Sequence, residues 1–595
     1  MKFFKNFLAA LLAVVVGSFV TVFVWIGAFS SMMSSFGTTP VVVEDNSILK
    51  IDFSESVVDA PSTNPFAGFD FMSMTAMPSV SLYDALRAID AAANDERIKG
   101  IYLNLDSAGT ADGLAIIEEL RTSIENFKKS GKFVVAFDDM YVQSEYYLAS
   151  VADKIYMHPE GSFMWQGLYF NNMFFTGLFE KLGVDVEIFR PTVCKYKSAV
   201  EPYFLKKMSP ANRLQMQELA DSMWATISSQ VAASRNISVE ELNRITDNLE
   251  IAIAEDALSK GLVDELAYED QLDNYFEEKG VERGDDDEYN YISLGEYISQ
   301  LAFDVDKLSA DKVAIVYAQG EITDGEDTQG AGDMIYGNTL AAELAEVRKD
   351  ESIKAVVLRV NSPGGSALAS DIIWREMELL RKEKPVIVSM GGYAASGGYY
   401  ISAPADAIVA DKMTLTGSIG VFGMMMNPTR ALERNLGITF DGVKSNKSAD
   451  MGMPGRNMTK QERAYIMRGV DKVYGRFTSL VAEGRNLPVE RVYEIAEGRV
   501  WSGSAAQEIG LVDMCGGLKD AIAVAADKAS LSNYRVIEHQ PELQGMAALF
   551  SQFGAQARAS FEMSQMGEFY NDLKSLRESI SQNGIVMYSS VRVDF

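Results

Sequence analysis

Residues 391–400 read Gly-Gly-Tyr-Ala-Ala-Ser-Gly-Gly-Tyr-Tyr, and an apolar run at residues 385–390 leads into them. The apolar run is typical of a buried strand, and residues 396–403 are expected to form a short helix that ends before Pro404. Small residues on both sides of Ser396 allow a sharp turn and the close approach of a substrate carbonyl. The N-terminus of the following helix would stabilise a developing oxyanion. The turn is therefore either the elbow of a serine nucleophile or a plain glycine-rich turn.

The composition describes an acidic globular protein. The chain has 595 residues, which predicts more than one domain, and its hydrophobic content of 47% is enough for a substantial core. A net charge of −29 argues against a nucleic acid partner, whose phosphates would repel the protein. Two cysteines, Cys194 and Cys515, are too few for a disulfide framework or a cysteine metal cluster.

Histidine is scarce in this chain. His158 and His539 are its two histidines, so few Ser-His-Asp arrangements can exist, and a site with three or more histidine ligands is excluded. Both histidines lie in stretches typical of surface residues. If Ser396 is a nucleophile, its base is therefore expected to be a residue other than histidine, and we expect no metal and no cofactor.

Residues 8–29 form an uncharged, mostly apolar segment that follows Lys2 and Lys5. At about 1.5 Å per residue, a helix of this length spans the ~30 Å hydrocarbon core of a bilayer. A cleavable signal peptide has a shorter apolar region of roughly 7–15 residues, so we predict a retained single-pass anchor, with cleavage near Gly27-Ala28 and Ser30-Ser31 as the alternative. The positive charges predict a cytoplasmic N-terminus and a protein body outside the cytoplasmic membrane.

Five blocks of sequence occur twice in the same order and with similar spacing, which indicates an internal duplication. The paired blocks are residues 95–109 and 350–364, 141–147 and 393–399, 152–155 and 405–408, 195–199 and 445–449, and 261–264 and 510–513. The second pair aligns Ser144 with Ser396. The predicted divisions are an anchor and tether at 1–45, a first repeat at 46–268, an exposed acidic linker at 269–310, a second repeat at 311–540 and a helical extension at 541–595.

Each repeat alternates strand-like apolar runs with amphipathic helices, such as those expected at 114–129 and 370–382. This alternation predicts an α/β fold made of βα units with a mostly parallel, layered sheet. Residues 61–80, rich in Pro, Phe and Met, are expected to form an apolar loop that either packs on the body or contacts lipid or a neighbouring subunit. The amphipathic helix expected at 546–581 is either an interaction arm or an ordinary packed helix.

The two repeats differ at the positions where chemistry would occur. Residues 145–146 of the first repeat read Glu-Tyr opposite the Gly-Gly pair that follows the serine, and would block the approach of a substrate carbonyl. The first repeat has Ala-Gly-Thr at 108–110 opposite Pro-Gly-Gly at 363–365, and Trp165 opposite Ser418. The nucleophile turn is therefore expected only in the second repeat.

A serine nucleophile without histidine needs another base. A lysine that is partly desolvated has a lowered pKa and can take the hydroxyl proton. Lys197 and Lys447 occupy equivalent places in the two repeats, whereas most other lysines are expected to be surface charges. Position alone leaves both residues open as the base.

Four motifs carry a resemblance to a known family. They are Tyr-Lys-Ser-Ala-Val-Glu-Pro at 196–202, Asn-Ser-Pro-Gly-Gly at 361–365, Tyr-Ala-Ala-Ser-Gly-Gly-Tyr-Tyr at 393–400 and Thr-Gly-Ser-Ile-Gly-Val at 416–421. Together with the anchor and both repeats, they closely resemble the long, duplicated form of the signal peptide peptidase A (protease IV) family over nearly the whole chain. The resemblance implies tandem domains with the fold of the caseinolytic-protease and crotonase group, built from stacked ββα units. It also implies a membrane-anchored serine endopeptidase that degrades cleaved signal peptides in the membrane.

The resemblance also assigns roles to individual residues. Ser396 matches the nucleophile, Lys197 matches a general base supplied by the first repeat, and Ser418 matches a serine that orients the lysine amine. The backbone N–H groups of Gly364 or Gly365 and of Gly397 match the oxyanion hole. In the short, unduplicated members the lysine follows the serine at about the place of Lys447, so this residue stays the alternative base.

The same resemblance implies partners and an assembly. The expected partners are peptide substrates and the membrane, and the expected assembly is a ring-like homo-oligomer, a tetramer, whose sites face an enclosed chamber. Two other classes of protein share these features in part. A crotonase-like enzyme acting on an acyl thioester would share the layered repeat without needing Ser396, and a non-catalytic membrane scaffold would have no reason to keep Ser396, Lys197 and Ser418 together.

Overall fold

The computed structural model describes residues 42–53, 55–61, 69–70, 75–76, 79–105, 113–284, 287–303, 310–327, 334–539 and 585–588. The predicted anchor at 8–29, the helix predicted at 546–581 and most of the apolar loop at 61–80 lie outside these residues. Within the described ranges, no helix combines the length and the apolar character that crossing a membrane requires.

The first repeat is built on a sheet whose described strands run in the order β10-β8-β7-β6-β1-β11. All the pairings in this sheet are parallel. The strands are β1 (Ser47–Ile51), β6 (Ile98–Asn104), β7 (Phe133–Tyr141), β8 (Lys154–Phe163), β10 (Glu265–Leu266) and β11 (Tyr291–Ser293). Central strands such as β6 are almost continuously buried, as expected for a parallel sheet covered on both faces.

The second repeat is built on a similar sheet, in the order β21-β19-β17-β15-β12-β23; β18 also pairs with β17, and β22 pairs with β18. Its strands are β12 (Lys312–Gln319), β15 (Ile353–Ser362), β17 (Val386–Ala395), β18 (Ala407–Ala410), β19 (Leu415–Gly417), β21 (Val500–Ser502), β22 (Met514–Cys515) and β23 (Arg535–His539). The β12–β15 pair shifts register after its first residue, as the β1–β6 pair does. This shared irregularity is structural evidence for the duplication predicted from the sequence.

A third sheet brings together strands from both repeats, in the order β14-β13-β16-β24-β20-β9. Its strands are β9 (Asp185–Phe189), β13 (Glu321–Thr323), β14 (Met334–Tyr336), β16 (Gly364–Ser366), β20 (Phe422–Asn427) and β24 (Ile585–Tyr588). Two further pairs join β2 (Ser56–Val58) to β5 (Ser79–Ser81) and β3 (Phe69–Asp70) to β4 (Thr75–Ala76). The antiparallel pairing of β9 with β20 joins the first repeat to the second.

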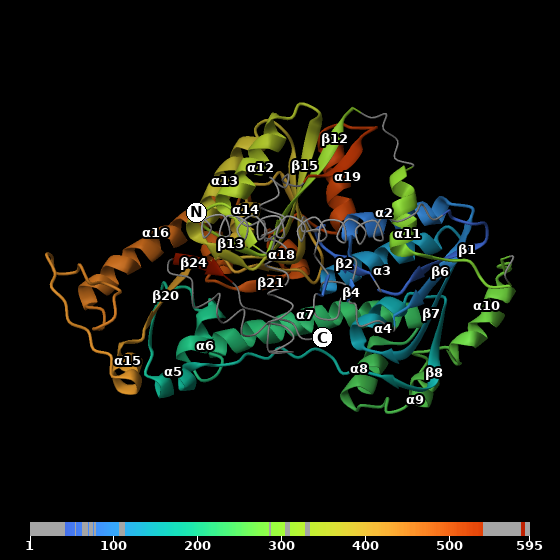
Figure 1. Ribbon diagram of the computed structural model, residues 1–595, viewed down its shortest axis with the longest axis horizontal. Coiled ribbons are helices and arrows are strands. Elements are labelled where there is room, and N and C mark those ends of the chain that lie inside the picture. The colour runs from blue at the N-terminus through green and yellow to red at the C-terminus, as the bar shows by residue number, and fades with distance from the viewer. Residues whose placement is uncertain are drawn as a thin grey trace, which may run out of the picture.

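Helices cover the sheets, and α7 and α16 are the two long ones (Figure 1). The helices of the first part of the chain are α2 (Leu82–Asn94), α3 (Leu114–Lys128), α4 (Gln143–Ala149), α5 (Thr176–Leu182), α6 (Glu201–Phe204), α7 (Pro210–Arg235), α8 (Val239–Asp247), α9 (Ala254–Ser259), α10 (Leu272–Glu278) and α11 (Leu294–Phe303). Those of the second part are α12 (Gly337–Lys349), α13 (Ala367–Leu380), α14 (Gly397–Ser402), α15 (Thr429–Leu436), α16 (Lys460–Gly484), α17 (Val489–Ile495), α18 (Gly503–Glu508) and α19 (Leu518–Lys528). Ser209 and Thr459 cap α7 and α16 at equivalent places, because each side chain accepts a backbone N–H of the first turn.

A buried ion cluster ties the two repeats together. Arg359 on β15 donates from Nε to Asp59 Oδ1 and from Nη2 to Glu119 Oε1, each at 2.8 Å, and both carboxylates belong to the first repeat. The three side chains are almost completely shielded from solvent. Arg359 also donates to Ser389 Oγ at 2.8 Å, so the guanidinium finds acceptors on both sides of the contact between the repeats.

The acidic segment 269–310 differs from the exposed linker that its charge predicts. It contains α10, β11 and α11, and β11 pairs in parallel with β1 of the first sheet. Phe276 is fully buried, and Tyr275 and Ile292 are buried near it and on β11. Apolar residues spaced between the acidic ones give this segment a packed face, which its overall charge conceals.

Candidate active site

Ser396 occupies a strained turn between β17 and α14. β17 ends at Ala395, α14 begins at Gly397, and Ser396 between them has φ 57° and ψ −110°. A positive φ is unfavourable for a residue with a Cβ and costs about 1–3 kcal/mol. The Ser396 N–H holds the turn by donating to the Gly417 carbonyl at 2.8 Å. The strand and the helix predicted around this serine are confirmed, with the helix starting one residue later than expected.

Lys197 reaches Ser396 from the first repeat. It lies between β9 and α6, and its side chain is fully buried. The amine Nζ lies 2.6 Å from Ser396 Oγ, 2.9 Å from Ser418 Oγ and 3.0 Å from the Ser418 carbonyl oxygen. The structure therefore brings together three residues that the sequence singles out from widely separated segments.

Burial decides the charge of the Lys197 amine. Removal from water lowers the pKa of Lys197 to about 7, and the charge interaction with Cys194 acts in the opposite direction. A neutral amine has two N–H donors and one lone pair. The two donors match the carbonyl and hydroxyl oxygens of Ser418, and the lone pair is left to accept the Ser396 hydroxyl proton.

The backbone around Lys197 is fixed by contacts from both repeats. The Lys197 carbonyl accepts from Arg190 Nη1 at 2.8 Å, and the Tyr196 N–H donates to the Glu497 carbonyl at 3.0 Å. Gly498 packs directly on the lysine, because a Cβ added there would lie 2.5 Å from Lys197 Cβ. No sequence motif identifies Gly498. Its need to be glycine becomes clear only from its contact with Lys197 in the folded chain.

Ser418 occupies a second strained position, directly after β19. Its φ is 50°, and its N–H donates to the Arg499 carbonyl at 2.6 Å. Its hydroxyl group and its carbonyl both face the Lys197 amine. The turn therefore aims two oxygen atoms of one residue at the same nitrogen.

Glycines line the other side of the serine. A Cβ on Gly397 would lie 3.1 Å from Gly364 Cα and from the Gly365 nitrogen, and 2.8 Å from Ser370 Oγ. A Cβ on Gly365 would lie 2.0 Å from the Ile322 carbonyl oxygen, so this position excludes every larger residue. The three glycines predicted for the oxyanion site thus lie together, and Ser370 is a neighbour that the sequence did not indicate.

Comparisons with known proteins match this arrangement to a family. A model described as peptidase family S49 matches residues 126–281 and 378–532, which include Lys197 and Ser396 respectively, and a model described as Clp protease matches residues 329–413. The chain belongs to peptidase family S49. It is a serine protease of this family with a duplicated S49 domain, as the resemblance in its sequence predicts.

Several proteins that are similar to this chain have names that describe them as proteases. "Protease 4" of Salmonella typhi is 36% identical over 83% of this chain and 80% of its own length. "Protease 4" of Haemophilus influenzae is 38% identical over 74% of this chain and 72% of its own length. "Serine protease SPPA, chloroplastic" of Arabidopsis thaliana is 33% identical over 74% of this chain and 64% of its own length.

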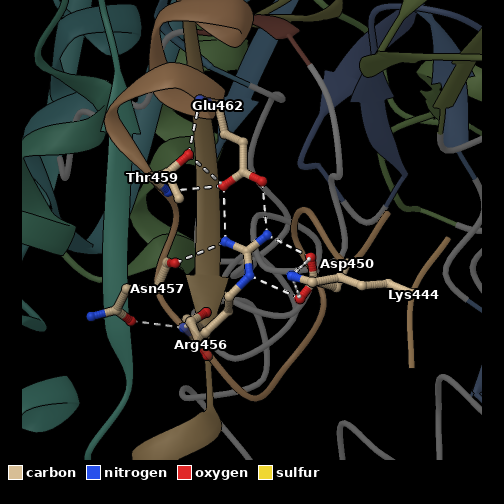
Figure 2. Close-up of polar contacts among 7 residues, drawn as sticks. Lys444, Asp450, Arg456, Asn457, Thr459 and Glu462 are labelled. Carbon is tan, nitrogen blue, oxygen red and sulfur yellow. Dashed lines mark hydrogen bonds and ion pairs between the residues drawn. The ribbon is translucent and has the colours of Figure 1, made fainter. Parts of the chain in front are cut away.

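In this S49 protein, the alternative base, Lys447, does not lie beside Ser396. Lys447 is exposed on the loop between α15 and α16. Figure 2 shows how this loop is held: Arg456 forms paired contacts with Asp450 on one side and Glu462 on the other. Lys444 adds contacts to Asp450 at 2.9 and 3.0 Å. In this structure Lys197, and not Lys447, lies beside Ser396.

The described residues around Ser396 do not form a metal site. Among the described residues of this S49 protease, no group of three or more His, Cys, Asp or Glu side chains could hold one. The polar atoms gathered at Ser396 are two hydroxyls, an amine and backbone groups. This set suits proton transfer and oxyanion stabilisation.

Proposed function

We propose that this protein hydrolyses peptide bonds with Ser396 as the nucleophile and Lys197 as the general base. The observation that carries the proposal is the 2.6 Å approach of a buried amine, with a pKa of about 7, to the Ser396 hydroxyl oxygen. A base whose pKa lies near the working pH is best suited to take and return a proton.

In the first half of the reaction, neutral Lys197 takes the Ser396 proton while Oγ attacks the peptide carbonyl carbon. The tetrahedral intermediate collapses, the lysine ammonium gives its proton to the leaving amine, and an acyl-enzyme remains on Ser396. In the second half, neutral Lys197 takes a proton from water, which attacks the acyl carbonyl. The lysine then returns that proton to Ser396 Oγ, and the carboxylic acid product leaves.

Two backbone amides are proposed to stabilise the oxyanion. The Gly364 N–H already donates to Ser362 Oγ at 3.1 Å. Gly365, whose nitrogen lies close to Gly397, is therefore proposed to supply one amide, and Gly397 the other. Removing one oxyanion donor typically costs about 10²–10³ in kcat.

Ser418 is proposed to orient the lysine. Its hydroxyl and carbonyl oxygens occupy the two N–H donors of the neutral amine, which turns the lone pair toward Ser396. After proton transfer, the same two oxygen atoms solvate the Lys197 ammonium. The described contacts of Lys197 include no carboxylate that could do so.

The proposed substrates are cleaved signal peptides, and the proposed location is the cytoplasmic membrane. Residues 8–29 are long and apolar enough to serve as a single-pass anchor, with the catalytic body on the outer, periplasmic side. An anchor would keep the site close to the apolar segments that remain in the bilayer after secretion. The name of the Arabidopsis relative and the motifs of the signal peptide peptidase A family support this assignment.

We further propose that the protein forms a ring-like homo-tetramer. In this assembly, the first repeat of one chain pairs with the second repeat of the next chain. Within one chain, β9 follows α5 and pairs with β20 of the second repeat. The matching segment after α15, which includes Ile438, Phe440 and Val443, is exposed, as is Tyr169 in the first-repeat segment that matches β20. The two exposed segments lie on opposite repeats, so pairing them between chains is head-to-tail and can close a ring.

The test of this assembly is its mass in solution. Val443→Asp places a charge in the exposed segment and is expected to convert the oligomer into smaller species by light scattering, while Lys447→Ala on the same loop leaves the mass unchanged. An unchanged mass in Val443→Asp would contradict pairing through this segment.

The test of the activity is hydrolysis of a fluorogenic apolar peptide by the detergent-solubilised full chain. Ser396→Ala and Lys197→Ala are each expected to reduce kcat by about 10³-fold or more, and Lys447→Ala, the matched control, to leave it unchanged. Light scattering confirms that each variant assembles. Full activity in Ser396→Ala would refute the serine mechanism, and an active Lys197→Ala with an inactive Lys447→Ala would move the base to the second repeat.

A further inference from the structure

The long helix α16 contacts both sides of the candidate active site. Its Phe477 ring lies 5.0 Å from the ring of Tyr400 on α14, the helix that begins directly after Ser396. One turn earlier, Tyr474 packs in the same buried cluster as Cys194, which lies three residues before Lys197. Figure 1 shows α16, in orange, running from the end of the molecule that carries α15 to the body beside α14. A single helix therefore supports the serine side and the lysine side of the site.

The Tyr474 side chain reaches the lysine turn through Cys194. Both residues are buried, with exposed fractions of 7% for Tyr474 and 0% for Cys194. The Tyr474 hydroxyl is hydrogen-bonded to the Cys194 thiol. The Cys194 carbonyl in turn accepts the Lys197 N–H at 3.2 Å. Cys194 therefore joins α16 through its side chain to the Lys197 backbone through its carbonyl.

Two backbone groups complete this contact. The Tyr474 hydroxyl is also hydrogen-bonded to the backbone of Glu497, and the Cys194 thiol to the backbone of Val421. Both backbone contacts lower the pKa of the side chain that they touch, as N–H donors do. The tyrosine and the cysteine are therefore fixed by the backbone as well as by each other.

These contacts meet where three backbone segments surround the Lys197 amine. The segments are residues 194–197, 418–421 and 497–499, and backbone hydrogen bonds of 2.6, 2.8 and 3.0 Å link the last segment to the other two. The side chains of Tyr474 and Cys194 contact all three segments and fasten them to α16.

The charged groups near this turn bind atoms other than the Lys197 amine. Arg190 donates to the Lys197 carbonyl at 2.8 Å, and the Glu497 carboxylate pairs with the Lys195 amine at 2.7 Å. Burial is the main reason for the lowered pKa of Lys197. How closely the three segments enclose the amine therefore decides how much water reaches it, and with that its basicity.

We propose that Tyr474, acting through Cys194, is a positioning residue for Lys197, which holds the lysine turn closed around the amine and keeps the amine at hydrogen-bonding distance from Ser396. The inference rests on the proposed function and adds a residue from outside the four sequence motifs. Because α16 also packs on α14, the same helix sets the position of the lysine turn relative to the serine.

Tyr474→Phe tests the proposal in the detergent-solubilised full chain, because it keeps the ring and removes the hydroxyl. We expect kcat at pH 7 to fall about 3–10-fold, the range for one lost neutral hydrogen bond, with KM unchanged. Water that reaches a less enclosed amine raises its pKa, so the midpoint of the pH profile of kcat/KM should move up by about 0.5–1 unit. The deficit should therefore narrow at pH 9. Tyr465→Phe, on the exposed side of the same helix, is the matched control and should behave as the wild type.

Cys194→Ala tests the same contact from its other end. Burial raises the pKa of the Cys194 thiol to about 11, so the thiol stays neutral between pH 5 and pH 9 and adds no ionisation to the profile. The variant is expected to reproduce the loss of kcat and the shifted midpoint. Because both residues act through one contact, the double variant Tyr474→Phe/Cys194→Ala should lose no more activity than either single variant. Thermal unfolding and light scattering confirm that each variant folds and assembles.

The outcomes separate this inference from the proposed function. An unchanged kcat in Tyr474→Phe, a loss that is equal at every pH, or losses that multiply in the double variant would overturn the positioning role. If such a result is found while Ser396→Ala and Lys197→Ala are inactive, the protease mechanism stands without Tyr474. If Lys197→Ala keeps its activity, the proposed function fails, whatever Tyr474→Phe does.

Discussion

The turn at Ser396 in the second repeat and the matching turn in the first repeat have similar backbone surroundings but different side chains at the central position. In the second repeat, Tyr399 donates its hydroxyl to the Leu511 carbonyl at 2.8 Å, and in the first, Tyr146 donates to the Leu262 carbonyl at 2.7 Å. These matched contacts shift the alignment of the two turns by one residue. Gln143 therefore lies where Ser396 lies, and the pairing of Ser396 with Ser144 expected from the sequence is wrong.

Gln143 fills the position that Ser396 occupies in the second repeat, where we propose a proton transfer. Its Oε1 accepts from the Gly167 N–H at 2.8 Å, and its Nε2 donates to the Gly167 carbonyl at 3.2 Å. Trp165, opposite Ser418 in the sequence, is buried with its ring 5.4 Å from the ring of Tyr146. The first repeat thus shows how this turn is made stable when nothing has to react there.

At the turn of the second repeat lies a destabilising amine instead, that of Lys197 from the first repeat. Lowering the pKa of Lys197 from 10.5 to about 7 corresponds to roughly 5 kcal/mol at 1.36 kcal/mol per pKa unit. The folded protein bears this cost in full below pH 7, where lysine is charged in both states. The cost fades as the pH rises to 10.5, where lysine is neutral in both. The difference between the two turns is therefore one between stability and reactivity.

The contact that joins the two repeats is expected to give the largest effect. Arg359→Ala leaves Asp59 and Glu119 buried without their partner, and we expect the free energy of unfolding to fall by about 3–5 kcal/mol. Urea denaturation followed by fluorescence measures this. Arg430→Ala is the matched control, because Arg430 pairs with Asp185 across the same two repeats at the surface and is expected to contribute at most about 1 kcal/mol. Equal effects of the two substitutions would contradict a special role for the buried cluster.

The acidity of Lys197 is expected to set the pH profile of hydrolysis. Because the neutral amine is the active form in the proposed mechanism, kcat/KM of the wild type should rise with pH to a plateau above about 7 and fall about tenfold for each unit below it. Stopped assays between pH 5 and pH 9 measure the midpoint. A profile that stays flat through pH 7 would show that another group controls the reaction.

Ser418 provides a smaller and more local test. Ser418→Ala removes the hydroxyl contact at 2.9 Å but keeps the carbonyl contact at 3.0 Å, so we expect kcat to fall about 10–100-fold, as for a lost hydrogen bond to a charged group worth about 1.5–3 kcal/mol. KM should stay constant, and the pH midpoint should move because the surroundings of the ammonium change. An unaltered kcat and midpoint would remove Ser418 from the mechanism.

The smallest effect is expected in the first repeat. Gln143→Ala leaves the Gly167 N–H and carbonyl without their side-chain partner, and should cost about 1–3 kcal/mol of stability with kcat unchanged. Thermal unfolding and the peptide assay measure the two quantities together. A loss of kcat in this variant would mean that the first turn takes part in the reaction after all.

The sequence predicts the layered α/β fold because the spacing of apolar residues is a local signal. It predicts the duplication because five blocks of sequence occur twice. The strand before Ser396 and the helix after it follow from an apolar run, small residues and Pro404. Lys197 and Ser396 are individually visible in the motifs, but composition and spacing could not choose between Lys197 and Lys447. Only the packing of the first repeat on the second brings one of them to the serine.

Other features depend on contacts that no short motif encodes. Gly498 is required by the path of Lys197, which comes from a distant segment. The segment 269–310 packs through a few apolar residues hidden among many acidic ones. The position of β24 depends on its two neighbouring strands, β16 and β20, which are distant from it in the sequence.

Lys197 and Ser396 lie 199 positions apart in the sequence, and this separation has a consequence for the timing of activity during synthesis. Under the proposed roles, the first repeat alone has a base without a nucleophile, and the second alone has a nucleophile without this base. A chain that is still being translated can therefore fold its first repeat completely without becoming a protease. Under these roles, cutting begins only once both halves are made and docked, which protects the growing chain from its own activity.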